Sequence, residues 1–319
     1  MSRWWIGVLL ILICGITSGY ADRLIVSNYP EELYEPGRLV SSPLDQGLTR
    51  LMYYHINRSS EAFILSTQLT NPNPYPVTIQ WRHGMGGPSE DGIYAGHRSA
   101  RLYWEKHVAN QWTHLVLQAG ESIQLLSQPL RHNMVSTALL EFQTNQSNVT
   151  LTIDALDPPF LLASALHQPS QPYRFGSFDS ASQQHQLIVD FKTPIQEIAL
   201  GGNQFLYDPQ SQILLRGNYG MIYEITALLK NPTAAHQTVA LYLAPLGGIT
   251  RGVLVIDDRI IETSFISYKT QLAPELVQSF SLKPHESRQV LIKTLPQGGC
   301  YYPVNLVFAA HLAGGGAAL

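Results

Sequence analysis

The sequence predicts an all-β protein made of two tandem sandwich domains, and three observations support this fold class. Segments of four to eight residues that alternate or run apolar recur along the chain, bounded by Pro, Gly, Asn or Asp, which is typical of strands joined by turns. Several phrases occur twice in the same order. A chain of 319 residues is long enough for two hydrophobic cores, and many short strands with regular turns favour sandwiches.

The repeated phrases predict an internal duplication, because four matches in the same order rarely arise by chance. Asn71-Pro72 recurs as Asn231-Pro232, and each pair lies between two strand-like segments, where Pro ends strand pairing. The other three matches are "LIVS" at 24–27 with "LIVD" at 187–190, "NRSSEAFILSTQL" from Asn57 with "NYGMIYEITALL" from Asn218, and "LQAGESIQLL" from Leu117 with "LKPHESRQVL" from Leu282. We therefore expect two copies of one ancestral sandwich.

The chain begins with the features of a secretory signal. Arg3 precedes an apolar run from Ile6 to Ile16 that is shorter than a membrane span, and small residues lead to a cleavage site after Ala21. We expect residues 1–21 to be a signal peptide and the mature protein to be secreted, periplasmic or at the cell surface, without a transmembrane segment. A lipid anchor on Cys14 is the alternative, which Ile13 disfavours because a small residue is expected there.

Composition sets the boundaries of the mature chain. We expect the first sandwich at 22–157, a linker or edge segment rich in Pro, Ser and Gln at 158–186, the second sandwich at 187–310 and a disordered tail at 311–319. If Cys14 leaves with the signal, Cys300 is the only cysteine and no internal disulfide can form. We expect Cys300 to be a partly buried small residue.

The two copies differ most in the long insert between conserved strands. In the first copy, "GHRSARLYWEKHVANQW" predicts a short helix near residues 99–109, since Ala, Arg, Leu, Glu and Lys favour helices. In the second copy, "ITRGVLVIDDRIIETSF" predicts a hairpin around Asp257-Asp258. Function often lies in such inserts, so the loop and helix of the first copy are a candidate interaction surface.

The phrases x-L-x-N-P followed by an alternating strand, and L-x-P-x-E-S-x-x-V, resemble those of bacterial extracellular immunoglobulin-like modules. In those modules a strand ending in Asn precedes a turn, and a Pro-Gly-Glu-Ser-type turn precedes a late strand. The resemblance covers both copies. It implies two immunoglobulin-like sandwiches that act as binding, spacing or adhesive elements, which is an analogy from fold and not evidence from a site.

The densest group of polar and aromatic residues lies between Trp81 and Trp112, around a glycine-rich stretch that we expect to be a solvated loop or an interdomain contact. Exposed aromatic faces flanked by polar groups bind sugars or partners, whereas the alternative for Trp in a sandwich is core packing. The candidate binding residues are Trp81, His83, Glu90, Asp91, Tyr94, His97, Arg98 and Trp104.

Other function classes were weighed on the same residues. His83, Glu90, Asp91 and His97 could serve as acid and base of a secreted hydrolase acting on envelope polymers, or could bind a divalent metal. The glycines lack the Lys-Ser/Thr ending of a phosphate loop. The net charge of −3 and the absence of a basic run argue against nucleic-acid binding.

We therefore expect an exported, non-enzymatic binding or structural protein of the cell envelope or extracellular space. It would need no cofactor and would contact an envelope or extracellular protein or glycan through the loop and helix inserted in the first sandwich.

Overall fold

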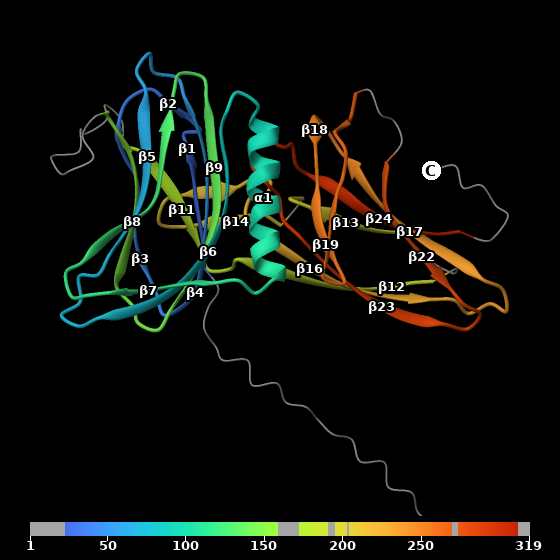
Figure 1. Cartoon of the computed structure of the whole chain (residues 1–319). Coiled ribbons are helices and arrows are strands. Elements are labelled where there is room, and N and C mark those ends of the chain that lie inside the picture. Colours follow the sequence, from blue (N-terminus) through green and yellow to red (C-terminus); the bar gives the residue numbers. More distant parts are fainter. Residues whose placement is uncertain (1–22, 159–171, 191–194, 203, 270–273, 312–319) are drawn as a thin grey trace, which may run out of the picture.

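The computed structural model describes residues 23–158, 172–190, 195–202, 204–269 and 274–311, and within them the chain is mostly β-strand with one helix (Figure 1). The strands form two lobes, with the helix α1 (Gly92–Val108) between them. The expected signal peptide, Cys14 and residues 312–319 of the expected tail lie outside the described residues.

The first lobe is a sandwich of two sheets. Its central sheet runs in the order β11-β1-β4-β9-β6-β7, with β2 paired to β4, and its outer sheet runs in the order β3-β10-β5-β8. The central sheet contains β1 (Arg23–Tyr29), β2 (Glu32–Leu33), β4 (Gly47–Asn57), β6 (Val77–Ser89), β7 (Thr113–Leu117), β9 (Val135–Thr144) and β11 (Arg174–Phe178). The outer sheet contains β3 (Gly37–Leu44), β5 (Phe63–Thr70), β8 (Ser122–Leu130) and β10 (Val149–Leu156).

The second lobe also has two larger sheets, in the orders β12-β16-β23-β19-β20 and β13-β24-β17-β22. The first contains β12 (Ser182–Val189), β16 (Ile222–Lys230), β19 (Val253–Ile256), β20 (Arg259–Glu262) and β23 (Ser287–Thr294). The second contains β13 (Ile195–Leu200), β17 (Gln237–Pro245), β22 (Glu275–Leu282) and β24 (Val304–His311). Two small hairpins complete the fold: β14 (Leu206–Asp208) with β15 (Ile213–Leu215), which contacts β11 of the first lobe, and β18 (Ile249–Thr250) with β21 (Ile266–Ser267) in the second lobe (Figure 1).

The central sheet is buried on both faces. Ile25 and Leu51 pack into the core between the two sheets of the first lobe. Their neighbours Leu24 and Met52 point the other way, into a core shared with α1 and the second lobe. A strand covered on both faces must be apolar at successive positions, which explains why "LIV" in β1 and "ALL" in β9 do not alternate.

Three of the four repeated phrases occupy matching hairpins. Asn71 links β5 to β6, and its Nδ2 donates to the Tyr75 carbonyl at 2.8 Å. Asn231 links β16 to β17, and its Nδ2 donates to the Ala235 carbonyl at 2.8 Å. The Glu of each "ES" phrase accepts from a backbone amide three residues before it, 2.6 Å from Gln118 and 2.7 Å from Lys283. These repeated polar residues therefore satisfy turn backbone that no strand partner reaches.

The fourth repeated phrase does not match in the fold. The "LIVS" phrase lies in β1, which runs parallel to β4 in the sheet that also holds β6. The "LIVD" phrase begins in β12, which runs parallel to β16 in the other type of sheet. The equivalence of these two phrases was wrong: "LIVS" lies in a strand that is buried on both faces, whereas β12 has exposed positions, with Ile188 51% exposed, and belongs to the other type of sheet.

Several expected elements have different bounds. The helix expected at 99–109 begins at Gly92, because Asp91 caps it and two of the glycines that suggested a loop, Gly92 and Gly96, lie within it. The segment expected as linker or edge at 158–186 includes the edge strand β11, paired with β1, and the start of β12. The expected hairpin at Asp257-Asp258 is confirmed: both residues have positive φ and join β19 to β20.

Candidate functional site

The glycine-rich segment expected as a solvated loop is mostly the end of β6, which packs directly against α1. A Cβ atom on Gly84 would lie 2.0 Å from the Ser99 carbonyl oxygen. A Cβ atom on Gly96 would lie 1.7 Å from the carbonyl oxygen of Gly298 in the second lobe. These glycines therefore let α1 approach a strand on one side and the second lobe on the other.

Trp81 and His83, on successive same-side positions of β6, stack with their ring centroids 4.8 Å apart. Trp81 is 7% exposed and belongs to the core of the first lobe, as the core-packing alternative expected. The Nδ1 atom of His83 lies 3.4 Å from Lys106 Nζ on α1. Burial, followed by the Lys106 charge, lowers the pKa of His83 to about 4.

Four more candidates lie just before α1 or in its first two turns. Asp91 is the N-cap: its Oδ1 accepts from the amides of Ile93 at 2.9 Å and Tyr94 at 3.0 Å. Glu90, Tyr94 and Arg98 are exposed.

We expect Asp91→Ala to destabilise the protein by about 1 kcal/mol, because two amides at the start of α1 lose their acceptor. Urea unfolding measures the loss. Asp91→Asn is the matched control and should stay within a few tenths of a kcal/mol of the wild type, since Asn caps as well as Asp. Equal stability of the Ala and Asn variants would contradict a capping role.

His97 and Trp104 lie on the buried side of α1, with exposures of 4% and 0%. The Nε2 atom of His97 lies 3.1 Å from the Glu262 carboxylate on β20, while burial and then Arg251 and Arg101 lower the pKa of His97 to about 4. His97 is therefore neutral near pH 7 and belongs to the contact between α1 and the second lobe.

The eight candidate residues thus do not form one site. His83 contacts Lys106, His97 contacts Glu262, Asp91 caps the helix and Glu90 is exposed, so the residues of the hydrolase hypothesis have separate surroundings. Among the described residues, no group of three or more His, Cys, Asp or Glu side chains is arranged to hold a metal ion. In the same part of the chain, no helix is long and apolar enough to cross a membrane.

A buried ion cluster, formed by Arg50, Arg82, Tyr103, His107 and Glu141, joins α1 to the central sheet. Glu141 is 1% exposed and pairs with Arg50 at 2.8 Å and with Arg82. Tyr103 donates to the same carboxylate at 3.1 Å. Arg50 also donates to the Ala181 carbonyl, at 2.5 Å, just before β12. The cluster therefore connects the central sheet, α1 and the start of β12 through ion pairs and hydrogen bonds.

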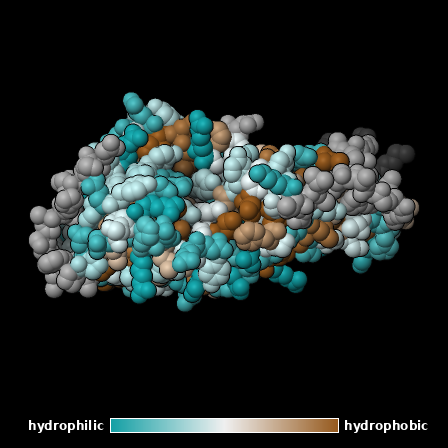
Figure 2. Space-filling view, turned by 90° about the horizontal axis from the view of Figure 1, so that it is seen from above, coloured by the Kyte–Doolittle hydropathy of each residue, from teal (hydrophilic) through white to brown (hydrophobic). Residues whose placement is uncertain are grey.

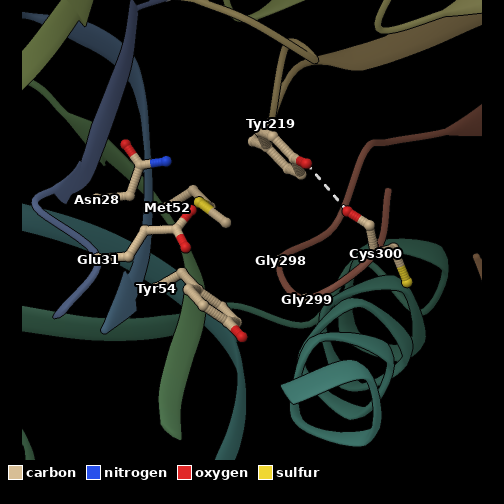
Figure 3. Close-up of a pocket in the computed structure, with 8 residues that line it drawn as sticks. All are labelled: Asn28, Glu31, Met52, Tyr54, Tyr219, Gly298, Gly299 and Cys300. Carbon is tan, nitrogen blue, oxygen red and sulfur yellow. Dashed lines mark hydrogen bonds between the residues drawn. The ribbon is translucent and has the colours of Figure 1, made fainter. Parts of the chain in front are cut away.

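An open cavity of about 210 Å³ lies where the two lobes meet (Figure 3). The first lobe supplies Asn28, Glu31, Met52 and Tyr54, and the second lobe supplies Tyr219 and Gly298–Cys300. Met52 and Tyr54 are buried, whereas Glu31 is exposed at the mouth. Tyr219 donates to the Cys300 carbonyl oxygen at 2.9 Å, and the Cys300 sulfur points away from that ring (Figure 3).

The electrostatics of the cavity are set by Glu31. Desolvation and the nearby Glu32 charge raise the pKa of the Glu31 carboxyl group above its usual value. Burial, and then the charge of Glu31, raise the pKa of Tyr54 to about 12 and that of Tyr219 further still. Glu31 therefore contributes to the raised pKa of a phenol on each side of the cavity, after burial.

Hydrophobic residues gather on the second lobe beside this junction. Two hydrogen bonds bring these residues together. The backbone amide of Tyr301, the residue after Cys300, donates to the Ile249 carbonyl at 2.9 Å, and the Tyr268 amide donates to the Gly248 carbonyl at 2.9 Å. Figure 2, seen from above Figure 1, shows brown residues near the middle of that face, where β18 lies. The exposed residues around β18 are Leu246, Ile249, Phe265, Tyr268 and Tyr301.

Sequence reasoning missed both the cavity and the buried ion cluster. Their residues are scattered along the chain and carry no motif, and the expectation for Cys300 is only that of a small, partly buried residue. That expectation is close to the structure, in which Cys300 is a free thiol and 4% exposed. Burial raises its pKa, so the thiol is protonated at neutral pH.

The structure is that of an all-β, sandwich-like protein with one helix. No protein-family model matches the sequence, and no curated protein is similar to it. Two solved structures align over 85% and 76% of this chain, at 7% and 9% identity: Fet3p, a multicopper oxidase that functions in iron import, and a multicopper oxidase from Campylobacter jejuni described as a metallo-oxidase. The alignments cover 60% and 47% of those chains with a TM-score of 0.13 each, which is too low to indicate a shared fold.

Proposed function

We propose that the chain is an exported, non-enzymatic binding protein of the cell envelope or extracellular space that receives its ligand at the cavity between the lobes. The observation that carries this proposal is the composition of the cavity, to which each lobe contributes one wall. A site divided between two lobes needs them to be held in a fixed relation, and the close packing of α1 provides this.

The polar groups of the cavity support a binding role. The Oδ1 atom of Asn28 is buried and has no hydrogen-bond partner among the described residues. Glu31 has no ion-pair partner in that same part of the chain, whereas its neighbour Glu32 pairs with Arg58 at 2.9 Å. A buried polar atom without a partner, such as Asn28 Oδ1, is costly unless a ligand or water satisfies it, and the exposed Glu31 carboxylate is available to pair with a charged ligand.

The first turn of α1, with the exposed Glu90 and Tyr94, would form one edge of the binding surface. A Cβ atom on Gly92 would lie 2.3 Å from the Tyr54 hydroxyl oxygen, so this turn adjoins the cavity. The exposed hydrophobic residues around β18 would extend the surface on the second lobe toward an envelope or extracellular protein or glycan.

The two lobes would be immunoglobulin-like modules derived from one duplicated sandwich. The matching registers support this origin: Thr70 faces Ser122 between β5 and β8, and Lys230 faces Ser287 between β16 and β23. The Asn and Glu side chains of the repeated turns also make the same backbone contacts in both lobes.

Export is tested by expressing the full chain in a bacterium and determining the N-terminus of the protein recovered outside the cytoplasm. We expect the mature chain to begin at Asp22, since cleavage after Ala21 fits the signal. Retention of residues 1–21 on cytoplasmic protein would contradict export.

Binding at the cavity is tested with a fragment library followed by ligand-observed NMR. We expect Asn28→Phe, which places a large side chain in the cavity, to abolish the signals of fragments that bind the wild type. The control Asn145→Phe adds the same ring at an exposed position and should bind every fragment as the wild type does. Fragments that bind the folded Asn28→Phe variant unchanged, or a wild type that binds none, would contradict the proposal.

A further inference from the structure

The cavity between the lobes combines one unpaired carboxylate with aromatic and thioether walls. Glu31, Met52 and Tyr54 lie together on the side of the first lobe, and Tyr219 lies across from them on the second lobe with its hydroxyl directed toward Cys300 (Figure 3). None of the eight lining residues is Lys or Arg. A positively charged group is thus the missing partner in this arrangement.

From this geometry we infer that the cavity binds the ammonium group of a small organic cation, with Glu31 as its counter-ion and Tyr54 and Tyr219 as its aromatic walls. The inference rests on the proposed binding function and names the chemical class of the ligand. Aromatic rings attract a cation through their negative faces, and a nearby carboxylate adds a direct charge interaction.

The size of the cavity fits this class. At about 210 Å³ it is smaller than the roughly 300–1,000 Å³ of sites for drug-sized ligands, so it suits a head group and not a large molecule. Desolvation, and then the charge of Glu32, raises the pKa of the Glu31 carboxyl group, and a cation at the carboxylate would oppose both effects. An ammonium ion that displaces the remaining water would restore its charge balance.

Glu32 provides an internal comparison for Glu31. It is the next residue, but its carboxylate already accepts from Arg58 at 2.9 Å and from the Tyr34 hydroxyl at 2.8 Å, outside the cavity. If an ammonium ligand recognises charge alone, the two carboxylates should contribute alike. If it recognises the cavity, only Glu31 should matter.

The experiment is a calorimetric and NMR titration of the folded protein with choline and with 3,3-dimethylbutan-1-ol, which has the same shape without the charge. We expect choline to bind the wild type at least tenfold more tightly than the neutral alcohol. Glu31→Gln should weaken choline binding at least tenfold, and Glu32→Gln should leave it within twofold. Tyr54→Phe should retain most of the affinity, because the ring face is kept.

Each other outcome overturns the inference. Choline binding that is equal in the wild type and in the Glu31→Gln variant, or equal binding of the neutral alcohol, shows that charge recognition by Glu31 is absent. If choline does not bind, but fragments bind the wild type and fail to bind the Asn28→Phe variant, the ammonium inference fails and the proposed binding function stands. If neither choline nor any fragment binds the wild type, both fail.

Discussion

Glu141→Gln should lower the free energy of unfolding by about 3–5 kcal/mol, the usual cost of removing one partner from a buried ion pair. Glu141 is the acceptor for both Arg50 and Arg82, and all three residues are at most 6% exposed. The amide keeps the shape of the side chain but leaves two guanidinium groups without a counter-charge. Because a domain is stable by only about 5–15 kcal/mol, this loss is a large fraction of the total.

The cluster already carries an excess of positive charge, which makes the loss of Glu141 more costly. Burial, and then Arg82, lowers the pKa of His107 to about 4, so this imidazole is neutral at pH 7. Two arginines and one carboxylate then remain. The Arg82 guanidinium lies 4.1 Å from the centroid of the Trp112 ring, which partly offsets its unbalanced charge.

Urea unfolding of the Glu141→Gln variant at pH 7 and low salt measures this effect. The matched control is Glu32→Gln, which breaks an ion pair whose side chains are 37% and 43% exposed and should cost far less, because solvent screens an exposed pair. A loss below about 1 kcal/mol for Glu141→Gln would show that the cluster does not hold α1 to the central sheet.

The strands were predictable because the burial of each strand's side chains appears as a pattern of apolar residues within that strand. In β17 and β16 the buried positions alternate along much of the strand, and this pattern is visible in the sequence. The Asn-Pro and Glu-Ser turns were predictable because their side chains act on backbone within a few residues or in the adjoining turn.

The predictions that were wrong or missing concern residues whose contacts lie far away in the sequence. Gly84 and Gly96 resemble loop residues, yet they are needed where α1 meets β6 and the second lobe. Arg50, Arg82 and Glu141 come from three different strands, so no spacing reveals that they meet. For the same reason, the candidate residues of the insert gave no indication of a cavity whose walls come from β1, β4 and the loop before β24.

Acid should destabilise the protein well above the pH at which its carboxylates titrate. Burial is the largest cause that lowers the pKa of four histidines, His55, His83, His97 and His107, to about 4 from an ordinary value near 6.5. Between pH 4 and pH 6.5 these imidazoles bind protons in the unfolded chain but stay neutral in the folded chain. Their contribution to stability is therefore fully present above about pH 6.5 and is lost as the pH falls toward 4.

The magnitude rests mainly on the two most buried imidazoles. His55 and His97 are 1% and 4% exposed, and each proton taken up only by the unfolded chain costs about 1.4 kcal/mol per pH unit. We expect these two residues to lower stability by roughly 2 kcal/mol between pH 6.5 and 5.5, because the unfolded imidazoles are only half protonated at pH 6.5, with a further loss from the less buried His83 and His107.

Urea unfolding at several pH values from 7.5 to 5 measures how the free energy of unfolding changes with pH. A variant that lacks one buried imidazole shows how much of this change that imidazole causes. His55 donates from Nδ1 to the Pro30 carbonyl at 3.2 Å and accepts at Nε2 from Ser27 at 3.0 Å, so His55→Asn keeps an amide in place of a titrating ring. The slope should decrease by about one proton in this variant and remain unchanged in His236→Gln, an exposed control. Stability that is flat from pH 7 to 5 would mean that these imidazoles accept protons while folded, and that their burial does not hold them neutral.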